Sequence, residues 1–125
     1  HKLTVLDLSN TSIDGDLEAL RAARSLNQLD LSNTRVSGTL LAFGQLSVLD
    51  LSNTQIKGDL MALQGSKWLT ALDLSNTRVT GNLTALQEAT GLIELDLSKT
   101  NISGHLDFLH SATKLKKLNL SNTPV

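Results

Sequence analysis

The chain has 125 residues, of which 40% are hydrophobic, 2% aromatic and 18% charged, with a formal net charge of −1 and no cysteine. This length fits one small domain, and the scarcity of aromatic side chains predicts an aliphatic core. The nearly balanced charge argues against nucleic-acid binding, and no apolar run approaches the roughly 18 residues of a membrane-spanning helix.

Six copies of one motif follow one another along the chain. They read LTVLDLSNTSI, LNQLDLSNTRV, LSVLDLSNTQI, LTALDLSNTRV, LIELDLSKTNI and LKKLNLSNTPV. The copies begin at Leu3, Leu26, Leu46, Leu69, Leu92 and Leu115, so successive starts are 23 residues apart except for one interval of 20. Such self-similarity indicates a solenoid, in which each unit contacts only its neighbours and the product is an extended binding surface.

Each copy opens with an alternating pattern that is typical of a strand. In the first copy Leu6 and Leu8 alternate with Val5, Asp7 and Ser9, so the leucines should point inward and the other side chains outward. Stacked copies then form one parallel sheet. The threonine that follows, Thr11 in the first copy, is expected to bond backbone groups in the loop after the strand.

The second half of each copy returns the chain to the start of the next strand. Residues 17–23 and their counterparts suit one or two turns of helix on the side opposite the sheet. The second copy is three residues shorter and reads LLAFGQ in this region. We expect a tighter return segment there, with Phe43 filling the volume that the missing residues would otherwise cover.

The spacing of the leucines resembles the leucine-rich repeat family, over residues 3–125. The recurring glycines Gly15, Gly38, Gly58, Gly81 and Gly104 are similar to those of its plant-type subclass. Two departures are consistent: the usual proline is missing from the return segment, and threonine replaces the usual asparagine after the strand. The resemblance implies an α/β solenoid, curved and right-handed, with a parallel sheet on the concave face and short helices or turns on the convex face.

The domain organisation follows from the repeats. Residues 1–125 are expected to form a single leucine-rich-repeat domain of about five and a half repeats. No polar cap is visible at either end, and an open end exposes a cross-section of the leucine core. The expectation is therefore that the array continues beyond these residues, with the alternative that other proteins cover its ends.

A row of carboxylates is the most specific chemistry on the expected concave face. Its members occupy one position in consecutive strands, about 4.8 Å apart, and are followed by Asn119 in the sixth: Asp7, Asp30, Asp50, Asp73 and Asp96. Serines two residues later are placed to donate hydrogen bonds to them. The row is either an inherited feature of the motif or a surface that attracts a basic peptide or cations. A calcium site is not expected, because the oxygens lie in a line and do not converge.

Five further residues are candidates for partner contact. Arg35 and Arg78 lie just past two strands and are expected to pair with an adjacent aspartate or with a carboxylate of a partner, the first being favoured. Trp68 replaces small or polar residues and is expected to be partly exposed. Lys116 and Lys117 belong to a basic cluster that is either solvated or an acidic-partner site. His105, Asp107 and His110 share no common direction, so no metal is expected.

The sequence therefore predicts a non-catalytic protein that binds other proteins, without cofactor or metal. The favoured function is a scaffold or accessory subunit of a larger assembly. The alternative is a segment of a receptor or receptor-like extracellular domain that recognises a peptide or protein on its concave face. The absence of cysteine favours an intracellular or organellar setting, since secreted relatives commonly cap their arrays with paired cysteines. Four glycosylation sequons point the other way, at Asn10, Asn82, Asn101 and Asn119.

Overall fold

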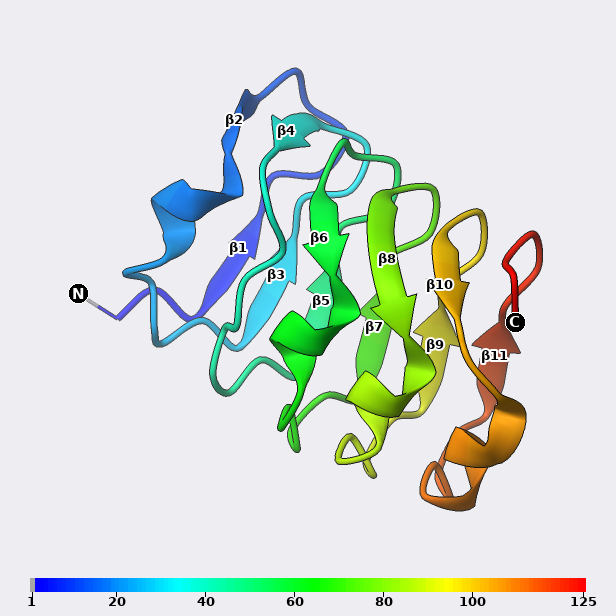
Figure 1. The fold of residues 1–125 in the computed structure, drawn as a ribbon. Helices are drawn as coiled ribbons and strands as arrows, with labels where there is room; N and C mark the ends of the chain where they lie inside the picture. The colour runs from blue at the N-terminus through cyan, green and yellow to red at the C-terminus, as the bar shows by residue number, and fades with distance from the viewer. Residues whose placement is uncertain (1) are drawn as a thin grey trace.

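A six-stranded parallel sheet forms one face of the protein. The structure is a computed structural model, and it describes residues 2–125. Neighbouring strands follow the order of the repeats (Figure 1) and pair equivalent residues, such as Leu29 with Leu49 and Asp30 with Asp50. The strands are β1 (Val5–Asp7), β3 (Gln28–Asp30), β5 (Val48–Asp50), β7 (Ala71–Asp73), β9 (Glu94–Asp96) and β11 (Lys117–Asn119). The predicted leucine-rich-repeat solenoid is confirmed.

Shorter parallel ladders line a second side of the solenoid. The first pairs β2 (Asp14–Asp16) with β4 (Arg35–Ser37). The second contains β6 (Lys57–Asp59), β8 (Arg78–Asn82) and β10 (Asn101–Ser103). These strands start directly after the loop that ends each main strand. Consequently each of the first five repeats contributes one strand to the main sheet and one strand to this lateral surface, whereas the described part of the sixth contributes β11 alone (Figure 1).

Single turns of 3₁₀ helix close four of the repeats, at η1 (Leu17–Leu20), η2 (Leu60–Leu63), η3 (Leu83–Leu86) and η4 (Leu106–His110). A side-chain oxygen of Asp16, Asp59 or Asn82 accepts a hydrogen bond from the backbone N–H two residues later and so caps the first three. The second repeat has no such turn in the structure, and its Leu41 and Phe43 are buried instead. The predicted tighter return is confirmed.

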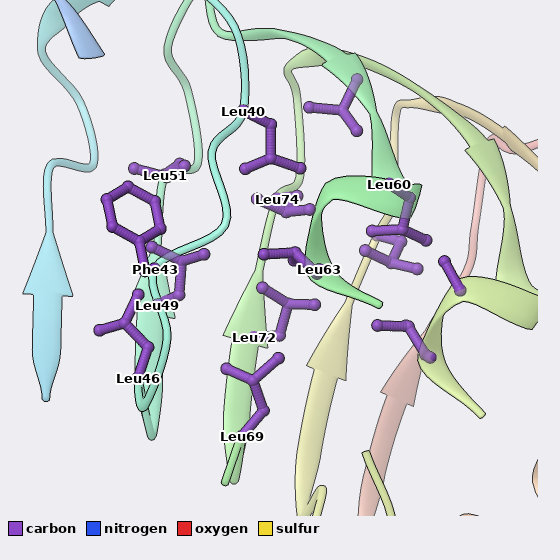
Figure 2. Close-up of a cluster of buried hydrophobic side chains, with 14 of the residues drawn as sticks. Leu40, Phe43, Leu46, Leu49, Leu51, Leu60, Leu63, Leu69, Leu72 and Leu74 are labelled. Carbon is purple, nitrogen blue, oxygen red and sulfur yellow. The ribbon is translucent and has the colours of Figure 1, made fainter. Parts of the chain in front are cut away.

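The core is a column of leucines between the main sheet and the return segments. Figure 2 shows Leu49, Leu51, Leu72 and Leu74 directed from their strands toward the interior, with Phe43 beside Leu49. Leu49 and Leu51 are 1% and 0% exposed, which identifies the interior face of the strand. The alternate residues Asp50 and Ser52 consequently face the other side of the sheet.

A left-handed residue and a threonine shape the loop after each main strand. Asn53, with φ of 55°, turns the chain, and the same position has positive φ in all six repeats. Thr54 Oγ1 then donates to the Leu51 carbonyl at 2.6 Å. The same Oγ1 atom accepts a hydrogen bond from the Ile56 N–H at 3.4 Å. The predicted bonding of this threonine to the backbone is therefore confirmed.

Candidate functional site

The outer face of the main sheet is hollowed over its C-terminal half. Its lining comes from the same three positions of β5, β7, β9 and β11. One column contains Val48, Ala71, Glu94 and Lys117, and therefore changes from apolar to charged along the solenoid. Lys117 Nζ lies 3.7 Å from Glu94 Oε1, and because both side chains are exposed this ion pair contributes little stability. Each repeat thus contributes a different side chain from this position to the lining of the hollow.

The row of aspartates forms the second column of this face. In each of the first five repeats one carboxylate oxygen accepts two hydrogen bonds from the serine two residues later. For Asp73, Oδ1 accepts from the Ser75 N–H at 2.9 Å and from Ser75 Oγ at 2.6 Å. Among residues 2–125 no hydrogen bond reaches the Oδ2 atom of any member of the row. One oxygen of each carboxylate therefore remains available to a ligand.

Burial and mutual repulsion act most strongly at the centre of the row. The pKa of Asp73 is raised by partial burial and by the charges of Asp50 and Asp96, while the two hydrogen bonds from Ser75 oppose this change. In the first repeat, Ser9 donates to the exposed Asp7 carboxylate and lowers its pKa. The aspartates of the row thus accept the same hydrogen bonds, but the pKa of Asp7 is lowered whereas that of Asp73 is raised.

The structure brings some of the predicted contact residues together and leaves others apart. Asp50, Asp73, Asp96 and Lys117 line the hollow, whereas Asp7 and Asp30 continue the row beyond it. Trp68 is 51% exposed, as predicted, but neither it nor Lys116 lines the hollow. The sequence-based candidates omit Val48, Ala71 and Glu94. Their signal was present, because they belong to an outward-facing column of the main sheet in which the copies differ.

Arg35 and Arg78 lie on the lateral surface. Both are exposed, and they line a second, shallow hollow together with Gln55 of the intervening repeat. The favoured prediction, pairing with an adjacent aspartate, is wrong, since within the described part of the chain neither arginine has a carboxylate oxygen within 4.0 Å. The reason is the direction of the strands: each arginine begins a lateral strand, after the chain has already turned away from the aspartate row.

The described residues contain no group of three histidine, aspartate or glutamate side chains that is arranged to hold a metal ion. His105 precedes η4, whereas Asp107 and His110 lie within it. No helix in residues 2–125 has the length and apolar character needed to cross a membrane.

A family model described as Leucine Rich Repeat matches residues 2–22, and no curated protein matches the sequence. Several solved structures share the fold. The plant peptide hormone receptor RGFR1, in complex with RGF2, has a TM-score of 0.86 and 24% identity over 96% of this chain and 20% of that chain. The ectodomain of the Arabidopsis thaliana membrane receptor kinase GASSHO1/SCHENGEN3, in complex with CASPARIAN STRIP INTEGRITY FACTOR 2, has a TM-score of 0.85 and 26% identity, over 98% of this chain and 16% of that chain.

A third match is the Arabidopsis receptor kinase HAESA, in complex with the peptide hormone IDA and the co-receptor SERK1. Its TM-score is 0.76, with 25% identity over 95% of this chain and 22% of that chain. The chain therefore spans less than a quarter of the length of each of these three structures. Their complexes with RGF2, CASPARIAN STRIP INTEGRITY FACTOR 2, IDA and SERK1 support a role in binding proteins.

These structures contradict the predicted intracellular or organellar setting, because they are parts of plant receptors and one is an ectodomain of a membrane receptor kinase. The absence of cysteine does not identify the compartment, and the reason is structural. Paired cysteines cap an array, whereas no position of the repeat itself requires one, so a run of repeats carries no information about redox compartment. The repeated motif, the solenoid fold and these matches together show a leucine-rich-repeat solenoid that is similar to the plant-type subclass.

Proposed function

We propose that this chain is part of an extracellular, receptor-like recognition domain that binds a peptide or protein segment on its main sheet. The observation that carries the proposal is the hollow over β5 to β11, which is open and lined by residues that differ from repeat to repeat. The likeness to the receptor kinase HAESA, solved with the peptide hormone IDA, and to the GASSHO1/SCHENGEN3 ectodomain, solved with CASPARIAN STRIP INTEGRITY FACTOR 2, supports it. The scaffold or accessory subunit that the sequence favoured has no comparable support, and the role we infer is non-catalytic.

The lining indicates which ligand the hollow fits. Four neighbouring strands span about 14 Å, the length of four to five residues of extended peptide. Val48 and Ala71 favour an apolar side chain at one end of that span. Asp50, Asp73 and Asp96, with one free oxygen each, favour a lysine or arginine side chain across the middle. A short peptide that combines a basic and an apolar residue matches this face.

An extracellular setting exposes the sequons to glycosylation. Asn82 is a suitable acceptor, because it is exposed and its Nδ2 atom makes no hydrogen bond within residues 2–125, while its Oδ1 accepts from the Thr84 N–H at 3.0 Å. Asn119 lies in the hollow, where its Oδ1 accepts from Ser121. We therefore propose a glycan on Asn82 and none on Asn119, since a glycan there would obstruct the ligand.

Photo-crosslinking tests the binding face. The photoreactive residue p-benzoylphenylalanine replaces Ala71 in the hollow, or Ala19 of η1 as a control on the convex side. The proposal predicts that the first variant, in the cells that make the protein, captures a secreted peptide or an ectodomain. Mass spectrometry then identifies the adduct, and Asp73→Asn should weaken its formation. Equal capture from both positions, or capture of an intracellular subunit from position 71, would contradict the proposal.

A further inference from the structure

We propose a second interaction surface, on the lateral side of the second to fourth repeats, that docks an acidic extended segment of a protein partner. Its cations are Arg35, Lys57 and Arg78, one from each of three consecutive repeats, and we call this set the lateral cationic surface. It lies on strands β4, β6 and β8, outside the hollow of the main sheet. The inference therefore stands independently of the peptide that the main sheet binds.

The hollow in this surface contains no acidic lining residue. Arg35 and Arg78 stand at its two sides, two repeats and therefore about 10 Å apart, with Gln55 between them. The rest of its lining consists of small polar residues, namely Thr34, Asn53, Thr54, Asn76 and Thr77. The two guanidinium groups are therefore the only charged groups that line it. A ligand that enters the hollow meets positive charge and no negative charge.

The positive charges are not neutralised within the described residues. The register of β6 and β8 places Lys57 directly opposite Arg78, and like charges in such a pair repel. Asp14 is opposite Arg35, but the two form no ion pair within 4.0 Å. Asp59, two residues after Lys57, uses Oδ1 to cap η2 by accepting from the Met61 N–H. An anionic partner would remove a repulsion that the fold leaves in place.

Most of the hydrogen-bond donors on the floor of the hollow are already used within the fold. Thr34, Thr54 and Thr77 are buried, and each donates to a leucine carbonyl at 2.6–2.7 Å. Asn76 Nδ2 donates to Asn53 Oδ1 at 2.9 Å. The floor therefore offers few free donors, and recognition falls to the long cationic side chains at its edges.

The separation of Arg35 and Arg78 indicates which ligand this surface fits. Arginine binds a carboxylate through two parallel N–H donors. In an extended chain, side chains two residues apart lie about 6.8 Å apart and point the same way, so two alternating acidic residues come within reach of both guanidinium groups. Charge complementarity therefore commits the surface to an acidic protein segment. A glycan at Asn82 does not obstruct it, because Asn82 ends β8 and Arg78 begins that strand.

The test is an NMR titration at low ionic strength with a capped peptide of alternating glutamate and serine. The matched probe replaces each glutamate with glutamine. We expect the Nε–Hε signals of Arg35 and Arg78 to shift and saturate with the glutamate peptide and to remain unshifted with the glutamine peptide. Arg35→Gln combined with Arg78→Gln should weaken binding about tenfold. Both residues are exposed, so unchanged core amide signals will show that the variant is folded.

A second double variant controls for non-specific attraction. Arg24→Gln with Lys67→Gln removes the same charge from two exposed residues that lie outside the hollow. Affinity within about twofold of the original protein is expected. Equal weakening by the two double variants would overturn the proposal, as would shifts spread over all exposed cations or no shift at Arg35 and Arg78.

Discussion

At the scale of single residues, the aspartate row combines a shared bonding pattern with unequal electrostatics. Asp73 has a raised pKa because of its burial and its charged neighbours, so the folded protein binds this proton more tightly than the unfolded chain, whose aspartates titrate near 3.9. The free energy of unfolding therefore falls as pH rises through the interval between the two pKa values. Asn119 already accepts the same two serine hydrogen bonds without a charge.

Asp73→Asn should accordingly stabilise the protein at pH 7 and low salt, by up to about 1 kcal/mol after allowance for solvent screening. The gain should shrink at high salt and disappear below about pH 4, where the aspartate is protonated in both states. Urea denaturation at pH 7 and pH 3 measures it. Asp7→Asn is the control with the opposite sign, because Ser9 lowers the pKa of Asp7 and so favours its charged form. Stabilisation by both substitutions would contradict this account.

The loop threonines give a second prediction at the residue scale. Thr54→Val keeps the shape of the side chain but removes the donor to the buried Leu51 carbonyl, so it should lower the free energy of unfolding by about 1–3 kcal/mol. Thr11→Val is the matched control, since Thr11 makes the same bond to Leu8 but is exposed, and water can replace it. Chemical denaturation of both variants should show the larger loss at Thr54; losses of equal size would show that burial does not set the effect.

At the scale of elements, the lateral strands pack closely enough to require glycine. Gly81 has φ of +115°, and a Cβ atom there would lie 2.9 Å from the Leu60 nitrogen and 2.5 Å from Asp59 Oδ1, which caps η2. Gly15 has a similar φ of +120° but open space around it. Gly81→Ala should therefore destabilise the protein by more than the roughly 1–3 kcal/mol of backbone strain expected for Gly15→Ala. Thermal denaturation of the two variants measures the difference. Equal losses of stability would show that the steric clash at Gly81 does not contribute.

Sequence reasoning was most successful for elements that the repeat itself encodes. The alternation of leucine with polar residues predicted the main strands, and the shortened second repeat predicted the missing turn around Phe43. The lateral strands were not predicted, because segments such as RVS and KGD are too short to show a period. The return segments form single 3₁₀ turns, since four or five residues are too few for a longer helix.

At the scale of the whole molecule, the two charged surfaces lie on different sides of one solenoid. The sequence predicted the aspartate row, because its members recur at one position, but it placed Arg35 and Arg78 near that row. The turn at each left-handed residue, such as Asn33 before Arg35, directs the chain away from the main sheet and so separates the arginines from the aspartate row. The compartment was also mispredicted, since the absence of cysteine is a property of the repeat motif and not of its location.

We propose that the main sheet of this protein recognises a secreted peptide or an extracellular protein. Photo-crosslinking from position 71, with position 19 as the convex control, is the decisive measurement. The account predicts one specific adduct with a secreted peptide or an ectodomain, formed only from position 71 and weakened by Asp73→Asn. Adducts that form equally from both positions, or an intracellular assembly subunit captured at position 71, would contradict it.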